Sequence, residues 1–211
     1  MDKGTLLAVC RVHALLPDQG SGVTAIDKRS VSGPVKIQPY GLFADVQADR
    51  KNHGGLHKAV YAYSQNDADY WSEQLGREIY PGLFGENLRL DGIDSSVALI
   101  GERWQIGTKA VVEVTMPRTP CAVFQRRMAE PQWVKRFTEV GRVGAYLRVL
   151  ETGSIQAGDE VTVIHRPEHG VTIRDWFGAP TIAKMQALQA EPGLELAPEY
   201  HPYFEKLRRR G

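Results

Sequence analysis

The chain has 211 residues, of which 42% are hydrophobic and 24% are charged. That length suits one domain of moderate size, or one domain with a small appendage, and the composition is ordinary for a globular protein. The 26 basic and 25 acidic residues leave a net charge of +1, so no bulk electrostatic attraction to nucleic acid or to anionic lipid is expected.

No apolar stretch approaches the roughly 18–20 residues that a membrane helix needs. The apolar run at residues 6–10 is too short for a signal peptide, so a cytoplasmic protein is predicted. Cys10 and Cys121 are the two cysteines, and a disulfide between them is disfavoured in that compartment. Two cysteines exclude a four-thiolate zinc site or an ordinary iron–sulfur cluster within one chain.

Short β-branched runs separated by glycines indicate a chain that is mainly β with peripheral helices. In residues 110–115, Val112 and Val114 are expected on one face of a strand and Glu113 and Thr115 on the other. Many short strands with glycine turns favour a β-barrel or a sandwich. Strands are expected at residues 6–15, 35–37, 59–63, 85–90, 98–100, 104–106, 110–115, 145–150 and 160–165.

Helices are expected at residues 64–78, with Ser64 as the N-cap, from about Cys121 to the residue before Pro131, and at residues 132–138. From about residue 170 the composition changes, and residues 181–190 look helical. We therefore predict a β-barrel domain at residues 1–168 and a short helical C-terminal appendage at residues 169–211. The basic end of the chain is interpreted as a solvated helix terminus.

The sharpest local pattern is residues 117–121, Pro-Arg-Thr-Pro-Cys, directly after a clean strand. Thr119 can cap the next helix and Pro120 suits its first position, which would put Cys121 in the first helical turn. The helix dipole and nearby Arg118 would favour the thiolate, which is both the nucleophile and a soft metal ligand. The alternative is that Cys121 is a small buried hydrophobe. Cys10 lies in an apolar run and is expected to be structural.

A second pattern is residues 51–58, with Gly54 and Gly55 between His53 and Lys58. Paired glycines let backbone amides approach a ligand, so the loop suits a phosphate or a polyoxygenated ligand, although a polar hairpin turn is an equal alternative. A third pattern, residues 84–88, indicates a bulge whose side chains bond to backbone. The sequence contains no Walker loop, hydrolase elbow or dinucleotide fingerprint.

Taken together, these segments resemble the MOSC (molybdenum cofactor sulfurase C-terminal) family, and the resemblance covers about residues 23–165. The small stand-alone bacterial members, whose MOSC domain precedes a helical tail, are the most similar. Seven segments follow the family's order: residues 26–28, Gly41-Leu42 with Asp45 and Gln47, residues 53–60, residues 84–88, residues 101–107, Pro117-Arg118 with Pro120-Cys121, and Gly141, Gly144 and Gly158-Asp159.

The resemblance implies a MOSC-type β-barrel that binds a molybdenum–pterin cofactor, with Cys121 as the metal ligand and catalytic residue. It implies that the residues of the family's polar pocket bind the cofactor: Lys28, His53, Gly54, Gly55, Lys58, Asn87 and Arg118. Pyridoxal phosphate is also associated with the family, but no specific Schiff-base lysine is evident, and Lys28 and Lys58 are the lysines to test.

Some family members reduce N-hydroxylated compounds to amines, so the resemblance favours a molybdenum-dependent oxidoreductase acting on a small molecule. The sequence has no electron-transfer motif of its own, so a reductase would need an external electron-donor protein. One alternative is a sulfur carrier or cofactor-delivery module with a persulfide or cofactor on Cys121 and no turnover. Another is a barrel that keeps the fold without the cofactor.

Overall fold

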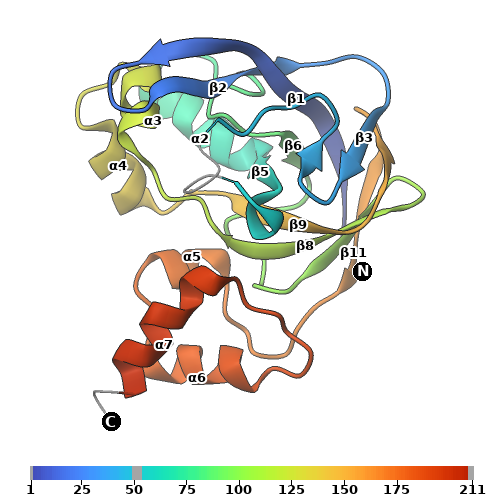
Figure 1. Cartoon of the computed structure of the whole chain (residues 1–211), viewed down its shortest axis with the longest axis vertical. Coiled ribbons are helices and arrows are strands. Elements are labelled where there is room, and N and C mark those ends of the chain that lie inside the picture. The colour runs from blue at the N-terminus through green and yellow to red at the C-terminus, as the bar shows by residue number, and fades with distance from the viewer. Residues whose placement is uncertain (1, 49–53, 209–211) are drawn as a thin grey trace.

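Seven strands form a closed barrel in the computed structural model, which describes residues 2–48 and 54–208 (Figure 1). The strand order around the barrel is β11-β7-β8-β9-β5-β6-β1, and pairing between β1 and β11 closes it. The mainly β architecture predicted from the sequence is therefore confirmed. The barrel strands are β1 (Lys3–Asp18), β5 (Val60–Ser64), β6 (Leu88–Asp91), β7 (Arg103–Ile106), β8 (Ala110–Pro117), β9 (Ala145–Glu151) and β11 (Glu160–His165).

β1 is long because it serves two pairings. Its first part lies between β6 and β11, and its second part forms an antiparallel hairpin with β2 (Gly22–Ser30), which extends beyond the barrel. Register shifts along both pairings bend the strand between these roles. A smaller sheet of β10 (Gly153–Ile155), β3 (Val35–Gln38) and β4 (Gly41–Leu42) lies beside the barrel.

Two of the strand predictions are wrong in their bounds or their type. β6 begins at Leu88 rather than at residue 85, because residues 81–84 form turns and the chain bends at residue 85 before the strand starts. Residues 98–100 are no strand, and Leu99 makes only an isolated bridge to Thr172. Ala98 and Ile100 are buried, and their backbones bond to Ile173 and Val171 of the C-terminal segment.

Helices α2 (Gln65–Leu75), α3 (Ala122–Met128) and α4 (Trp133–Val140) pack on one side of the barrel. Ser64 is the N-cap of α2 as predicted, although its hydroxyl bonds to Ser95 and not to the helix. Ring-to-ring contacts at centroid distances of 4.5–5.8 Å hold the three helices against the barrel. The rings belong to Trp71, Phe84, Phe124, Trp133 and Phe137.

The C-terminal helices form a group beside the barrel, with α5 next to β8 (Figure 1). They are α5 (Ile173–Phe177), α6 (Ile182–Ala190), η2 (Pro198–Tyr200) and α7 (His201–Arg208). The Tyr200 hydroxyl donates to the Thr115 carbonyl oxygen at 2.6 Å. Glu113 and Thr115, which the alternation of β8 places on the outer face, are buried: Glu113 pairs with Arg103 and Arg148, and the Thr115 hydroxyl donates to the His57 carbonyl oxygen.

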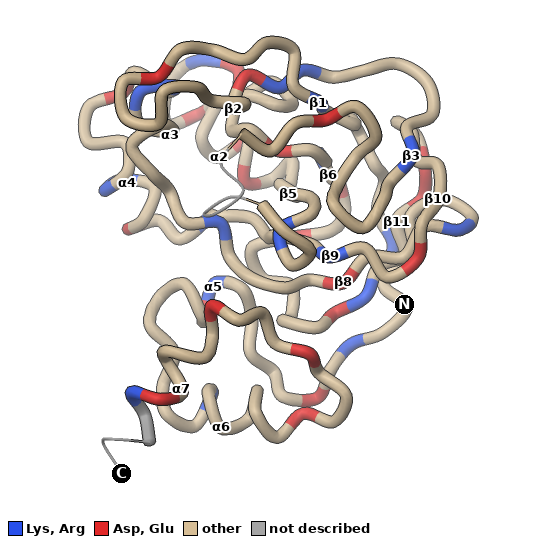
Figure 2. The backbone as a smooth tube through the Cα atoms, viewed as in Figure 1, with Lys and Arg blue, Asp and Glu red and all other residues tan. Residues whose placement is uncertain are grey.

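Basic and acidic positions are interspersed over the barrel and the C-terminal helices (Figure 2). Among residues 2–48 and 54–208, no helix is long and apolar enough to cross a membrane.

Candidate functional site

A pocket with a volume of about 120 Å³ opens beside the start of α3. Its walls come from the β1–β2 hairpin, residues 45–48, residues 58–61, residues 84–87, the segment from Arg118 to Val123, and Tyr146. Sites that bury a drug-sized ligand hold roughly 300–1,000 Å³. The pocket is therefore smaller than such sites.

Cys121 lines this pocket and is the N-cap of α3, with an extended backbone at φ −134° and ψ 174°. The prediction that Thr119 caps the helix is wrong, because the helix begins two residues later than the proline pattern suggested. The thiol still lies at the helix N-terminus, where the backbone dipole favours negative charge. Its side chain is partly exposed, so a ligand entering the pocket can reach it.

Arg118 also lines the pocket, and its residue is only 5% exposed. Its guanidinium carbon lies 3.8 Å from the centroid of the Phe124 ring, a cation–π contact that holds the group in place. Nη1 is buried without a hydrogen-bond partner among the described residues. A buried guanidinium nitrogen without an acceptor is costly, and an anionic oxygen in the pocket would satisfy it.

Lys28 lines the same pocket and pairs with Asp45, Nζ to Oδ2 at 2.7 Å. Burial alone would raise the pKa of the Asp45 carboxyl, but the Lys28 ammonium and bonds from Val12 and Asn87 outweigh it and lower that pKa. An ammonium has three N–H donors, so Lys28 can bind a ligand oxygen while it keeps Asp45.

Asn87 lines the pocket, but its side-chain amide forms hydrogen bonds with other residues of the protein. Its Nδ2 donates to the Cys10 carbonyl oxygen at 3.1 Å and to Asp45 Oδ2 at 2.8 Å, and its Oδ1 accepts from the Tyr61 amide at 3.2 Å. Both amide hydrogens are thus engaged. In the described structure Asn87 orients Asp45, which in turn orients Lys28.

Lys58 is the second lysine of the pocket wall, and it forms an ion pair with Glu199 of η2 at 2.7 Å. Gly54 and Gly55 do not line the pocket, and the Gly55 amide donates to Gln47 Oε1 at 3.3 Å. Gln47 also bonds through Nε2 to the Lys58 carbonyl oxygen. His53, predicted as a cofactor-binding residue, lies outside the described residues.

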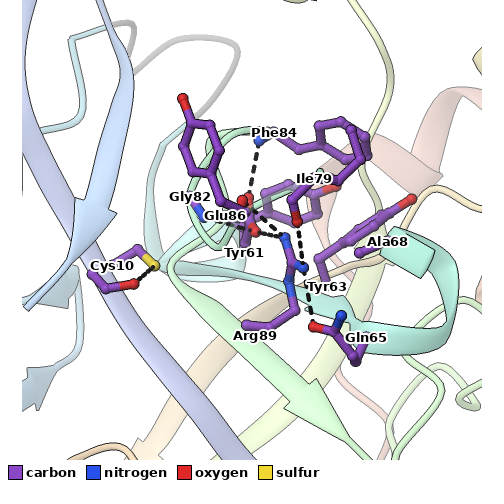
Figure 3. A network of polar contacts seen from close by, with 12 residues as sticks. Cys10, Tyr61, Tyr63, Gln65, Ala68, Ile79, Gly82, Phe84, Glu86 and Arg89 are labelled. Carbon is purple, nitrogen blue, oxygen red and sulfur yellow. Dashed lines mark hydrogen bonds and ion pairs between the residues drawn. The ribbon is translucent and has the colours of Figure 1, made fainter. Parts of the chain in front are cut away.

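A buried ion pair between Glu86 and Arg89 holds one wall of the pocket in shape (Figure 3). The Glu86 carboxylate accepts from the backbone amides of Gly82 at 2.8 Å and Phe84 at 3.1 Å. This confirms the prediction that a side chain within residues 84–88 forms hydrogen bonds with the backbone. Gly82 also approaches β2 so closely that a Cβ there would lie 2.5 Å from the Lys28 carbonyl oxygen.

Cys10, in contrast, is fully buried in β1 near this ion pair (Figure 3). Burial, helped by the Glu86 carboxylate, raises the pKa of its thiol to about 12. The Cys10 thiol is therefore shielded from solvent and protonated, whereas the Cys121 thiol lies at a polar pocket.

Asp45 and Gln47 also line the pocket, although the sequence patterns did not assign either of them to cofactor binding. Their places in the family's motif order were a signal, but their contacts with Lys28 and Lys58 join separate segments of the chain. Among the described residues, no three His, Cys, Asp or Glu side chains are grouped to hold a metal ion.

A family model described as the MOSC domain matches residues 49–162, more than half of the chain. The chain belongs to the MOSC family. The protein YiiM from Geobacillus stearothermophilus has the same fold, with a TM-score of 0.78 and 26% sequence identity. That comparison covers 97% of this chain and 98% of that one, so the likeness includes the C-terminal helices.

Two curated relatives reach one-third identity. YflK of Bacillus subtilis strain 168, described as uncharacterized, is 33% identical over 176 residues, which are 81% of this chain and 79% of that protein. A protein of Gibberella moniliformis named "Reductase" is 33% identical over 151 residues, 70% of this chain. Those residues are only 27% of the fungal protein, so the chain spans about a quarter of its length.

Proposed function

We propose that this MOSC protein binds a molybdenum–pterin cofactor in the Cys121 pocket and reduces N-hydroxylated small molecules to amines. The observation that carries the proposal is the pairing of two groups in one pocket. Cys121 offers a soft thiolate, and Arg118 offers a buried guanidinium whose Nη1 has no partner among the described residues. A soft metal attached to an anionic organic group fits that pair.

In this proposal, each polar residue of the pocket has a separate role in binding the cofactor. Cys121 would be the protein's ligand to the metal, and Arg118, Lys28 and Lys58 would bind anionic and carbonyl oxygens of the cofactor. Asp45 and Asn87 keep Lys28 oriented toward the pocket. When bound, the cofactor supplies the two-electron redox chemistry.

The net reaction is R–NHOH + 2 e⁻ + 2 H⁺ → R–NH₂ + H₂O, in which the N–O bond is broken. The electrons would come from an external donor protein. The relative named as a reductase supports this reaction class, and its much greater length leaves room for a donor module.

The geometry gives no support to pyridoxal phosphate. A Schiff base requires a neutral amine, whereas Lys28 is paired with Asp45 and Lys58 with Glu199. Both lysines are therefore assigned to oxygen binding in the proposal.

The first test is the molybdenum content per chain, measured by plasma mass spectrometry on protein from cofactor-competent cells. Wild type is compared with Cys121→Ser, with Cys10→Ala as the thiol control, and with protein from cells that cannot make the pterin. We expect near-stoichiometric metal in wild type and Cys10→Ala, and a loss of at least tenfold in the other two samples.

The second test supplies loaded protein with a chemical reductant and a panel of hydroxylamines and amidoximes. Formation of the amines or amidines by wild type but not by Cys121→Ser supports the reductase. Loaded protein that reduces no compound of the panel overturns it. A sulfur on Cys121 that cyanide removes, seen by intact mass, would identify the chain as a sulfur carrier.

A further inference from the structure

The far half of the β1–β2 hairpin, residues 13–25, lies outside the protein core. We call these residues the hairpin arm. None of them is buried, and two of their large apolar side chains, Leu15 and Val23, are 50% and 43% exposed. A two-stranded hairpin that buries no apolar face is marginally stable by itself. The hairpin arm therefore depends on contacts with the rest of the molecule to keep its place.

The hairpin arm joins the barrel at a break in the strand pairing. Register shifts in the pairing of β1 with β2 lie on both sides of Ala14. Such shifts interrupt the ladder and let the paired strands bend. On the barrel side of Ala14 the hairpin is anchored, because Asp27 and Lys28 of β2 are buried and each forms an ion pair. The bend at Ala14 is thus the point at which the hairpin arm can move relative to the barrel.

An ion pair with α3 holds the tip of the hairpin arm (Figure 1). Arg126 donates through Nε and Nη2 to the two carboxylate oxygens of Asp18, each at 2.8 Å. The Ser21 amide, Arg126 and the Gly20 amide all lower the pKa of the Asp18 carboxyl, so it is ionised at neutral pH. In the described structure, every hydrogen bond from the hairpin arm to a residue outside the hairpin joins Asp18 and Arg126.

The hairpin arm is also a wall of the Cys121 pocket, to which it supplies Ser21 and residues 23–25. The pocket holds about 120 Å³, whereas sites that bury a drug-sized ligand hold roughly 300–1,000 Å³. Tyr61 and Phe84, which line it from the barrel side, are buried in the core and cannot give way without disrupting it. The hairpin arm is therefore the wall that can move most easily to enlarge the pocket.

We infer that the hairpin arm is a lid over the Cys121 pocket, hinged at Ala14 and latched by the Asp18–Arg126 ion pair, which opens to admit planar ligands. The Arg126 side chain is 40% exposed, so salt weakens the latch by screening it. The lid controls access to Cys121 whatever the pocket binds. It can therefore be tested without a cofactor and without turnover.

The test measures how fast the Cys121 thiol reacts in the full chain, purified free of metal from cells that cannot make the pterin. Two reagents are compared: iodoacetamide, which is small, and monobromobimane, which is planar and bicyclic. Arg126→Gln should raise the monobromobimane rate about three- to tenfold, because the pair it removes is bidentate but partly exposed. The iodoacetamide rate should change much less. In wild type, about 1 M salt should raise the monobromobimane rate toward that of the variant.

The sign of the effect separates access from electrostatics. Removing a cation from α3 would by itself favour the neutral thiol and slow both reactions. A faster reaction of Arg126→Gln with monobromobimane therefore reports an opened pocket.

Arg136→Gln is the matched control, because Arg136 of α4 also forms an exposed ion pair, with Glu130 at 3.7 Å, and its side chain is 36% exposed. It should change neither rate. Cys10, buried in β1, should stay unlabelled in both variants. The inference is overturned if wild type and Arg126→Gln react equally fast with monobromobimane, or if Arg136→Gln accelerates that reaction as much. Labelling of Cys10 together with Cys121 would also overturn it, because β1 would then open as a whole.

Discussion

Glu199 Oε1 lies 2.7 Å from Lys58 Nζ, so a carboxylate of the C-terminal segment reaches the edge of the pocket that contains Cys121. A neighbouring contact is similar: Glu195 binds Arg148 at 2.5 Å. Together these pairs hold the C-terminal segment against the barrel. The Lys58 pair competes directly with any anion that would bind Lys58.

We expect Glu199→Gln to change stability little and to remove the carboxylate that competes with an anion for Lys58. Glu199 is 44% exposed, so the pair contributes at most about 1 kcal/mol. The free energy of unfolding, measured with urea, should fall by no more than that amount in dilute buffer. The difference from wild type should vanish in about 1 M salt, because screening weakens exposed pairs. A loss that persists in salt would show that Glu199 acts through packing instead.

We expect Asp45→Asn to be strongly destabilising, because it leaves the buried Lys28 ammonium without its counter-charge. Breaking a buried pair by removing one partner costs about 3–5 kcal/mol. Adding Lys28→Met should recover much of that loss, which a double-mutant cycle by urea denaturation measures. If the double variant is no more stable than Asp45→Asn, the ion pair is not the cause.

The Lys28–Asp45 ion pair also predicts how the free energy of unfolding changes with pH. The pKa of folded Asp45 lies below its ordinary value of 3.8, so its contribution to stability is present above that pH. The contribution is lost as the pH falls through the folded pKa. The gap in unfolding free energy between wild type and Asp45→Asn should therefore be constant from pH 7 to 5 and shrink below about pH 4. A gap that widens in acid would contradict the assignment.

We expect Arg118→Met to keep or raise the stability of the cofactor-free chain while molybdenum retention falls at least tenfold. Arg118 has no ion pair among the described residues, and replacing such a buried charge with an apolar side chain removes a desolvation cost. Arg127→Met is the contrasting control on α3, because Arg127 pairs with Asp27 at 2.7 Å. That variant should lose stability and keep its metal. Thermal unfolding and plasma mass spectrometry measure the two properties.

The two thiols should react very differently with iodoacetamide in the folded protein at pH 8. Cys10 is fully buried, and burial raises the pKa of its thiol to about 12. Cys121 lies in the pocket and is partly exposed. Intact mass should show a single addition, mapped to Cys121 by peptide analysis, and two additions in denaturant. Alkylation of Cys10 in the folded chain would show that β1 opens.

Much of the barrel could be predicted because its strands have local patterns. The strand at residues 160–165 has the predicted bounds, and α6 lies within the predicted residues 181–190. The errors have long-range causes. The backbones of Ala98 and Ile100 bond to the C-terminal segment, and a run buried by tertiary contact cannot be told from a strand by its residues.

The candidate site was predictable as a set of residue types but not as a network. Cys121, Arg118, Lys28, Lys58 and Asn87 do line one pocket. The pairing of Asp45 with Asn87 spans 42 positions, and no local spacing encodes it. The ion pair between Lys58 and Glu199 joins the barrel to the C-terminal segment. The sequence around a charged residue does not indicate which distant residue it will pair with.

The pairing of β1 with β11 also constrains how the molecule is assembled. Lys3 and Glu160, which are bonded at this seam, are 157 positions apart in the chain. The ring of strands cannot close until both ends of that long interval meet, and contacts of such high sequence separation slow folding. Until then β1 and β11 expose unpaired edges that invite association with other chains. We therefore expect the seam to limit the folding rate and to be the place where aggregation begins when folding is interrupted.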